Sequence, residues 1–188
     1  MRRIMTGSAR GTHLLTLSGD ATRPTSERTK EALFSMLQQK PVGARVLDLF
    51  AGSGQLGLEA LSRGATSAVF VDGSKEAAAI VQKNADKTHL ADRATIVVSD
   101  AISYLKTCRQ APFDLVFLDP PYAAGLLPQC LRLLYPLLTP DAIVVAESGH
   151  ADDVFGNDAS LTEQYTTIKQ NRYGVAHLTV LSPKEAEL

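Results

Sequence analysis

The stretch VLDLFAGSGQLGLEALSRG, residues 46–64, indicates the fold of this chain. It starts as an apolar run typical of a buried strand, continues through a glycine loop, and ends in a helical pattern closed by Gly64. Outward from it, apolar runs at 67–72, 94–100, 113–119 and 142–148 alternate with helical patterns at 75–90, 101–108 and 125–138. Strands that are apolar throughout and alternate with helices predict a parallel sheet covered on both faces.

The two ends of the chain add further elements to this pattern. A helix is expected at 26–39, shortly after Pro24, and residues 1–24 are expected to form an extended arm or small hairpin. Two candidate strands at 164–170 and 175–182, joined by a turn at 171–174, predict an antiparallel edge. The chain has no internal repeat and no low-complexity linker. We therefore expect an N-terminal basic arm of residues 1–24 and one domain of residues 25–188.

Composition points to an ordinary globular protein. Hydrophobic residues make up 45% and charged residues 21% of the 188 residues, close to the average for globular domains. No apolar run approaches the roughly 18 residues that a membrane span needs, and the first residues lack the apolar core of a secretory signal. Cys108 and Cys130 have no metal-ligand spacing, and the four histidines are scattered. We expect reduced thiols, no metal, no membrane contact and a cytoplasmic location.

The glycine loop predicts a nucleotide-like ligand. Gly52 to Gly57 form the pattern G-x-G-x-x-G between a strand and a helix, and Asp72 follows 20 residues after Gly52. This spacing fits a dinucleotide site, in which an acidic residue binds ribose hydroxyls. Asp48, however, would repel a pyrophosphate and attract the ammonium group of S-adenosylmethionine. We therefore expect S-adenosylmethionine above Gly52 and Gly54, with a nicotinamide dinucleotide as the alternative.

Four strands place an acidic residue at one predicted edge of the sheet, where open α/β sheets bind ligands. These residues are Asp48, Asp72, Asp100 and Asp119. Each alone is more often a helix cap than a ligand, but four along one edge favour a site. Asp100 is expected to accept a hydrogen bond from the adenine amino group, and Phe50 is included among the cofactor-binding residues.

The segment FDLVFLDPPY ends a strand in Asp119-Pro120-Pro121-Tyr122. A planar exocyclic amine is difficult to methylate because its lone pair is delocalised into the ring. A carboxylate and a backbone carbonyl that accept hydrogen bonds from its two N–H groups would direct that lone pair at a methyl donor. The prolines would hold both acceptors in place. Tyr122 offers a face on which a flipped or unpaired base can stack. The four residues therefore predict amino-directed methyl transfer.

The chain resembles a known family in three segments taken together. These are RPTSERTKEALFSML, then VLDLFAGSGQLGLEALSRGA, then FDLVFLDPPY, and the order resembles the RsmD-type 16S ribosomal RNA guanine-N2 methyltransferases. The resemblance implies a class I S-adenosylmethionine-dependent methyltransferase fold, a Rossmann-like α/β sheet of seven strands with an antiparallel last strand. It implies methyl transfer to N2 of one guanine in small-subunit rRNA, within an assembled ribosomal particle. It also places Arg23, Thr25 and Arg28 near the cofactor and the RNA entrance.

Other functions are compatible with parts of the same motifs. A DNA adenine-N6 methyltransferase shares the tetrapeptide, but it usually needs a separate target-recognition region. A protein glutamine methyltransferase typically has Asn in place of Asp119 and an added helical domain. A non-catalytic nucleotide-binding module would not require residues 119–122.

Charge is distributed unevenly along the chain. Residues 1–45 carry a net charge of +5 and residues 46–188 a net charge of −6. The basic segment, with Arg10, Arg23 and Arg28, is therefore the expected RNA contact. We expect removal of residues 1–11 to weaken RNA binding while leaving the melting temperature nearly unchanged. The alternative is an arm that packs into the fold with Ile4 and Met5 buried.

Overall fold

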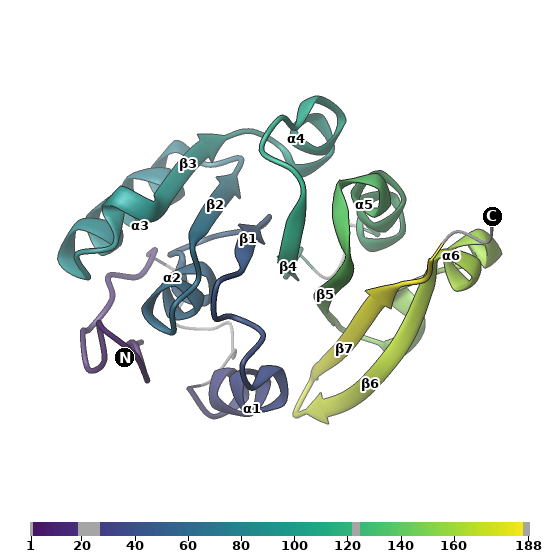
Figure 1. Cartoon of the computed structure of the whole chain (residues 1–188), viewed down its shortest axis with the longest axis horizontal. Coiled ribbons are helices and arrows are strands. Elements are labelled where there is room, and N and C mark those ends of the chain that lie inside the picture. The colour runs from purple at the N-terminus through teal and green to yellow at the C-terminus, as the bar shows by residue number, and fades with distance from the viewer. Residues whose placement is uncertain (1, 19–26, 122–124, 186–188) are drawn as a thin grey trace.

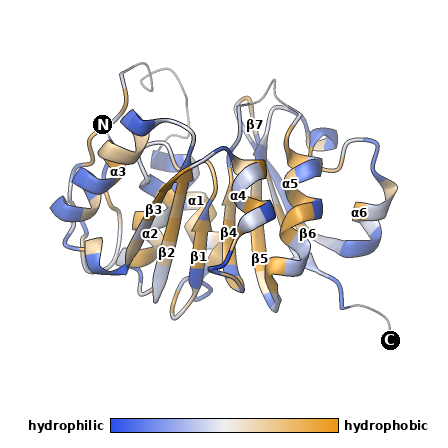
Figure 2. Ribbon diagram, turned by 90° about the horizontal axis from the view of Figure 1, so that it is seen from above, coloured by the Kyte–Doolittle hydropathy of each residue, from blue (hydrophilic) through white to orange (hydrophobic). Residues whose placement is uncertain are grey.

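The computed structural model describes residues 2–18, 27–121 and 125–185, and these form one seven-stranded sheet between two layers of helices (Figures 1 and 2). The strand order is β3-β2-β1-β4-β5-β7-β6. The first five strands are parallel, and β7 is antiparallel to both of its neighbours. The predicted mixed sheet with an antiparallel last strand is therefore confirmed. The strands are β1 (Arg45–Asp48), β2 (Ser67–Asp72), β3 (Ala94–Val98), β4 (Phe113–Leu118), β5 (Leu138–Ser148), β6 (Tyr165–Tyr173) and β7 (Ala176–Pro183).

Each face of the sheet has its own apolar core. The helices are α1 (Glu27–Leu37), α2 (Gln55–Ser62), α3 (Lys75–Lys87), α4 (Ala101–Thr107), α5 (Leu127–Leu134) and α6 (Ala159–Gln164), with short 3-10 turns at η2 (Ala91–Arg93), η4 (Tyr135–Leu137) and η5 (Ala151–Asp153). Residues of α1, α2 and α3 pack on one face, and residues of α4, α5 and α6 pack on the other (Figure 1). Because both faces are covered, a central strand such as β4 can be apolar along most of its length.

The element boundaries depart from the sequence expectation in places that have local causes. The strand predicted to end at residue 100 ends at Val98, because Asp100 caps the next helix. The helix predicted over 125–138 is divided into α5 and η4. Strand β6 extends to Tyr173, so the turn before β7 is shorter than the predicted turn at 171–174. Helix α6 was not predicted, because Leu161 is its only buried residue and gives no periodic pattern.

The N-terminal arm is packed against the domain, which agrees with the alternative interpretation of an arm that packs into the fold. Ile4 N–H donates to the carbonyl of Thr12 at 3.0 Å and Leu14 N–H to that of Arg2 at 2.8 Å, which folds the arm back on itself. The side chain of Ile4 is fully buried. Gly7 lies so close to α2 that a Cβ there would be 1.7 Å from the Ser62 carbonyl oxygen. Of the two residues named in the alternative, Ile4 is buried and Met5 is half-buried.

A buried ionic network fixes the arm to two helices. Lys30 on α1 and Glu59 on α2 are 1% and 0% exposed, with 3.3 Å between Nζ and Oε2. Glu59 also accepts from the backbone N–H of Met5 at 2.9 Å and of Thr6 at 3.1 Å, and pairs with Arg63 at 3.0 Å. Burial lowers the pKa of Lys30, and the Glu59 carboxylate opposes that shift. We call Lys30, Glu59, Arg63 and the two arm amides the Glu59 network.

Candidate active site

Parallel strands bring the four predicted carboxylates to one edge of the sheet. Asp48 and Asp72 are the last residues of β1 and β2, Asp119 directly follows β4, and Asp100 lies two residues after β3. Because β3, β2, β1 and β4 are consecutive neighbours, the carboxyl ends of these strands form a continuous edge. This edge is where an open α/β sheet binds its ligand.

The loop after β1 is shaped by its glycines and by Asp72. One carboxylate oxygen of Asp72 accepts from Gly52 N–H at 2.9 Å, and the other accepts from Ser74 N–H at 2.9 Å. Gly52 has a φ of +55°, and no described residue has an atom within 4 Å of the position of a Cβ. At Gly57 a Cβ would lie 2.3 Å from Phe70 Cε1, so this glycine allows α2 to pack on β2. Among the described residues, the loop is tight on its inner side and open above Gly52, which leaves room for a ligand.

Asp48 lies beneath this loop and is 2% exposed. Its carboxylate accepts from Gly57 N–H at 3.0 Å. Burial raises the pKa of Asp48 to about 7; the hydrogen bond from Gly57 opposes this shift, and the nearby charge of Asp72 adds to it. A cationic group above the loop would favour the ionised carboxylate. Asp48 is therefore suited to a ligand ammonium, with little of its surface open to contact.

Asp100 and Phe50 are the two predicted cofactor contacts at the periphery. Asp100 is exposed and caps α4, with its carboxylate accepting from Ser103 N–H at 2.9 Å. Hydrogen bonds from Ser103 lower the pKa of Asp100. Its geometry is that of a helix cap, and the contact with adenine stays a prediction. Phe50 is half-buried, next to the glycine loop.

The proline turn after β4 borders a cavity of about 380 Å³, which we call the acceptor cavity. Asp119 is half-buried, Pro120 buried and Pro121 exposed. Tyr122, which the sequence predicts as a stacking platform, lies outside the described residues, as do Arg23 and Thr25. Among the residues lining the cavity are Pro120, Pro121, Leu126, Glu147, Ser148 and Asp153. Its volume is within the usual range of ligand sites.

Sequence reasoning missed two buried polar residues next to the site. Glu147 on β5 is 5% exposed and lies at the same edge of the sheet as Asp119. Asn84 on α3 is fully buried; it accepts from Leu15 N–H at 2.8 Å and donates to the carbonyls of Leu15 and Ser53, both at 2.9 Å. Asn84 thus joins the arm to the glycine loop. The position of Glu147 near the end of an apolar strand could have revealed it, whereas nothing in the helix sequence marks Asn84.

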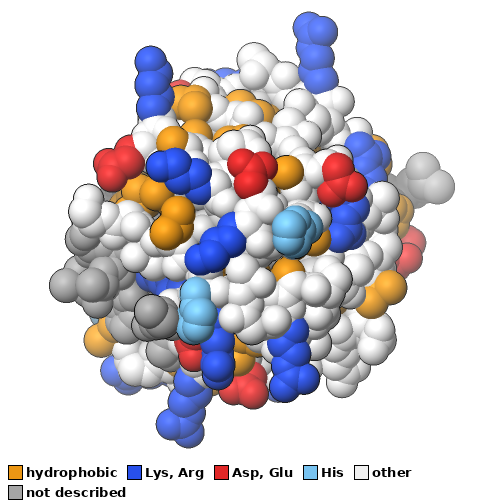
Figure 3. Space-filling view, turned by 90° about the vertical axis from the view of Figure 1, so that its left-hand side faces the viewer, with side chains coloured by type: hydrophobic (Ala, Val, Ile, Leu, Met, Phe, Trp, Pro, Cys, Tyr) orange, Lys and Arg blue, Asp and Glu red, His pale blue; other side chains and the backbone are white. Residues whose placement is uncertain are grey.

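The predicted RNA-contact residues within the described part of the chain are Arg10 and Arg28, and both are exposed. The left-hand side of the molecule in Figure 1, on which the arm lies, carries Lys and Arg side chains interspersed with Asp and Glu (Figure 3). The excess of Lys and Arg in the first 45 residues therefore does not make this face uniformly basic, because acidic side chains also lie on it.

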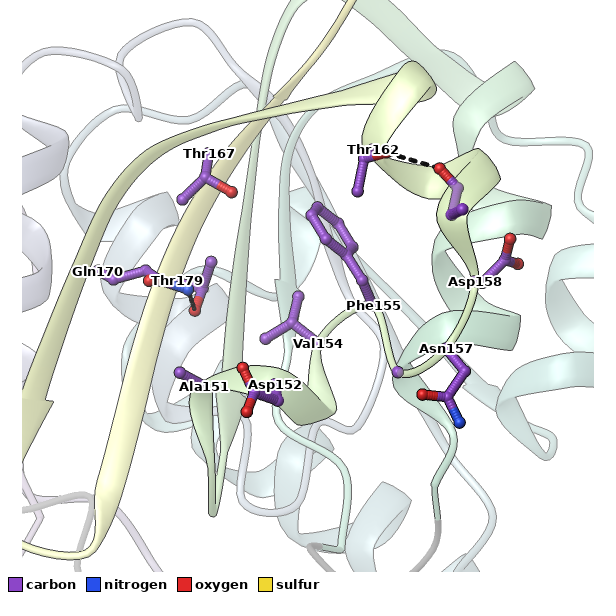
Figure 4. Close-up of a pocket in the computed structure, with 12 residues that line it drawn as sticks. Ala151, Asp152, Val154, Phe155, Asn157, Asp158, Thr162, Thr167, Gln170 and Thr179 are labelled. Carbon is purple, nitrogen blue, oxygen red and sulfur yellow. Dashed lines mark hydrogen bonds between the residues drawn. The ribbon is translucent and has the colours of Figure 1, made fainter.

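A second cavity, of about 550 Å³, lies between the η5–α6 segment and the strands β6 and β7 (Figure 4). Phe155 points across it toward Thr167, and Thr179 and Gln170 line the opposite wall. Its described lining includes none of the predicted site residues. Within the described residues, no cluster of three or more His, Cys, Asp or Glu side chains could hold a metal ion. No helix in the same part of the chain is long and apolar enough to cross a bilayer.

The sheet order, the glycine loop after β1 and the Asp-Pro-Pro turn after β4 together define a class I methyltransferase. A family model described as Conserved hypothetical protein 95 matches residues 2–182. Ribosomal RNA small subunit methyltransferase D of Haemophilus influenzae is 34% identical over 92% of this chain and 89% of its own length. The Escherichia coli protein of the same name is 39% identical over 78% of this chain and 74% of its own. The chain belongs to this RsmD-type family, as its motifs predict.

A solved structure supports the same assignment over the whole fold. The structure of the Escherichia coli protein yhhF has a TM-score of 0.82 and 32% sequence identity, and the match covers 97% of this chain and 98% of that one. The arm and the C-terminal hairpin therefore belong to the fold that the two proteins share.

Proposed function

We propose that this protein transfers a methyl group from S-adenosylmethionine to the exocyclic N2 of one guanine in small-subunit ribosomal RNA. The substrate is an assembled ribosomal particle in the cytoplasm. The observation that carries the proposal is the adjacency, at one sheet edge, of an open glycine loop and of an Asp-Pro-Pro turn that borders a cavity. Two relatives over 30% identical are named as small-subunit rRNA methyltransferases, which supports the substrate class.

The residues at the glycine loop fit the proposed cofactor. Gly52 leaves open space above the backbone, Asp72 retains lone pairs that can accept from ribose hydroxyls, and Asp48 supplies the charge for an ammonium group. S-adenosylmethionine, when bound, supplies an electrophilic methyl group on its sulfonium. The role of the loop is to hold that group facing the end of β4.

Asp119 and the proline turn act on the acceptor amine. The Asp119 carboxylate and the Pro120 backbone carbonyl would each accept a hydrogen bond from one N2–H group. These two hydrogen bonds direct the nitrogen lone pair toward the methyl donor. The main catalytic effect is positioning in line with the donor, supported by acceptors that need no reorganisation. A base presented in this way must leave its stack, so the target guanine is flipped out or unpaired.

Analysis of rRNA nucleosides tests the proposal directly. Small-subunit rRNA from a strain lacking the gene should be missing a single N2-methylguanine, and purified small subunits from that strain should regain it on incubation with the protein. Parallel reactions with naked rRNA and with DNA containing adenine distinguish the particle from the alternatives. Methylation of DNA adenine, or an unchanged nucleoside profile, would contradict the proposal.

A further inference from the structure

We propose that Glu147 selects guanine at this site by accepting a hydrogen bond from the N1–H of the target base. The inference rests on the proposed methylation of N2 and names the group that reads the rest of the base edge. It makes Glu147 a specificity-determining residue that touches the substrate, distinct from Asp119, which acts on the amine.

The register of the sheet places Glu147 next to the reacting position. Leu118 on β4 pairs with Ala146 on β5, so the residues that follow, Asp119 and Glu147, are also neighbours. Adjacent strands lie roughly 4.8 Å apart. Asp119 and Glu147 line one small cleft together with Thr29 and Leu118, and Glu147 also lines the acceptor cavity beside Pro120 and Pro121. Glu147 is thus the described residue that belongs to both spaces.

The acceptor cavity favours a ligand edge rich in hydrogen-bond donors. Its described lining includes the carboxylates of Glu147 and Asp153 and no Lys or Arg. Asp153 serves the local turn, where its carboxylate accepts from His150 N–H at 3.1 Å. Glu147, at 5% exposure, is a carboxylate held in a largely dehydrated position, where hydrogen bonds to charge are strong. The two described carboxylates would repel a phosphate and would bind an N–H.

Guanine alone among the common RNA bases matches this set of acceptors. Its Watson–Crick edge carries an N1–H donor directly beside the N2 amine. Adenine and cytosine also carry an exocyclic amine, but the adjacent ring nitrogen is an acceptor, and its lone pair would face the Glu147 carboxylate. Flipped bases are commonly read along this edge, and a site built to bind an N–H rejects analogues that lack it. Asp119, Pro120 and Glu147 together therefore specify an amine flanked by a ring N–H.

The experiment compares two bases that share the reacting amine and differ at N1 and in the 6-oxo group, and the Glu147 variants separate the part of the preference that depends on this side chain. Small subunits are reconstituted around rRNA whose mapped target position is guanine or, through splinted ligation, 2-aminopurine, which has an unprotonated N1. Glu147→Gln should lower kcat/KM on guanine by about 10- to 100-fold, because the charged acceptor is removed. It should lower the guanine to 2-aminopurine ratio by at least about tenfold, because the amide can donate to N1. Calorimetric affinity for S-adenosylmethionine should be unchanged.

Two further variants separate recognition from structure. Asp153→Asn changes a carboxylate in the same cavity and should leave the ratio of the two substrates unchanged. Glu147→Asp keeps the charge on a shorter side chain, and should lower the rate while keeping the preference for guanine. The inference is overturned if Glu147→Gln slows both substrates equally or if Glu147→Asp loses the preference. Failure of the wild-type protein to methylate guanine N2 would instead overturn the proposed function.

Discussion

Replacement of Asp119 by alanine should reduce methyl transfer by about 100- to 1,000-fold, because the reacting amine no longer has its fixed acceptor. Asp119→Asn should keep part of the rate, since an amide oxygen can still accept one hydrogen bond. Single-turnover methylation of purified small subunits measures both rates. Calorimetry with S-adenosylmethionine is the control, and its affinity should stay within a few-fold of wild type. Full activity of the alanine variant would remove Asp119 from the mechanism.

Replacement of Asp72 by alanine should weaken binding of S-adenosylmethionine by about 10- to 100-fold. The carboxylate holds Gly52 N–H and Ser74 N–H, so the variant loses both a ribose acceptor and the support of the loop. Asp158→Ala is the matched control, because it removes an Asp helix cap worth about 1 kcal/mol from α6, away from the glycine loop. Isothermal titration of both variants, alongside their melting temperatures, compares the two carboxylates. An unchanged affinity for the Asp72 variant would refute its role.

The raised pKa of Asp48 predicts a pH dependence of cofactor binding. In the ligand-free protein this pKa is about 7, so much of the carboxyl group is neutral at lower pH. A ligand ammonium favours the ionised form, so binding should release a proton and affinity should rise as pH increases from about 6 to about 7.5. Calorimetric titrations across this pH range measure the affinity, and titrations in buffers of different ionisation enthalpy measure the proton release. Asp48→Asn should abolish the proton release, and a wild-type affinity that falls with pH would contradict the assignment.

At the scale of elements, the Glu59 network makes the arm part of the folded domain. Glu59→Ala should destabilise the protein by about 3–5 kcal/mol, because it leaves the buried Lys30 ammonium without its counter-ion. The double variant Lys30→Met, Glu59→Gln should be destabilised less, since the charge that loses its carboxylate is that of the half-buried Arg63 and not of the fully buried Lys30, and the amide oxygen still accepts from an arm N–H. Urea denaturation measures both. A double variant less stable than Glu59→Ala would show that the ion pair itself supplies the stability.

Removal of residues 1–11 should lower the melting temperature, contrary to the outcome expected from sequence. The deletion exposes the surface that Ile4 covers and takes two amide donors from Glu59. Thermal unfolding monitored by circular dichroism measures the shift. Gly7→Ala is a point variant with the same expected direction, because a Cβ there collides with the Ser62 carbonyl. An unchanged melting temperature in both proteins would mean that the arm adds no stability.

The elements that were predicted correctly are those whose packing can be inferred from the pattern of apolar and turn residues close together in the sequence. Strand β2 was predicted with its observed bounds, since it is apolar and flanked by turn residues. The packing of the arm was predicted only as an alternative, because its partners Glu59 and Asn84 lie more than 50 residues away and no local pattern indicates them. Likewise the glycine loop and Asp119 are motifs within short segments. Glu147 joins the site only through the register of β4 and β5, which needs the folded sheet.

At the scale of the whole molecule, charge rather than packing should govern RNA affinity. Arg10 and Arg28 are exposed, and each phosphate that an arginine no longer neutralises should reduce the slope of log affinity against log salt by roughly 0.7 to 0.9. The variant Arg10→Gln, Arg28→Gln should therefore bind small subunits more weakly and with a flatter salt dependence. Lys106→Gln, Lys169→Gln is the control, with two exposed charges removed from α4 and β6. Equal slopes for the two variants would take these arginines out of the RNA interface.

The position of β1 in the sheet has a consequence for co-translational folding. Its partner β2 is complete at Asp72, and the arm's contacts with α2 and α3 need the chain only as far as Asn84. The other side of β1 pairs with β4, which ends at Leu118. At roughly 5–20 residues per second, synthesis of the 20 residues between the end of β3 at Val98 and Leu118 takes about 1–4 s. During that interval a half-sheet can assemble from β1, β2 and β3 together with the arm, α2 and α3. The edge of β1 in this half-sheet stays unpaired until β4, the strand that Asp119 follows, is available.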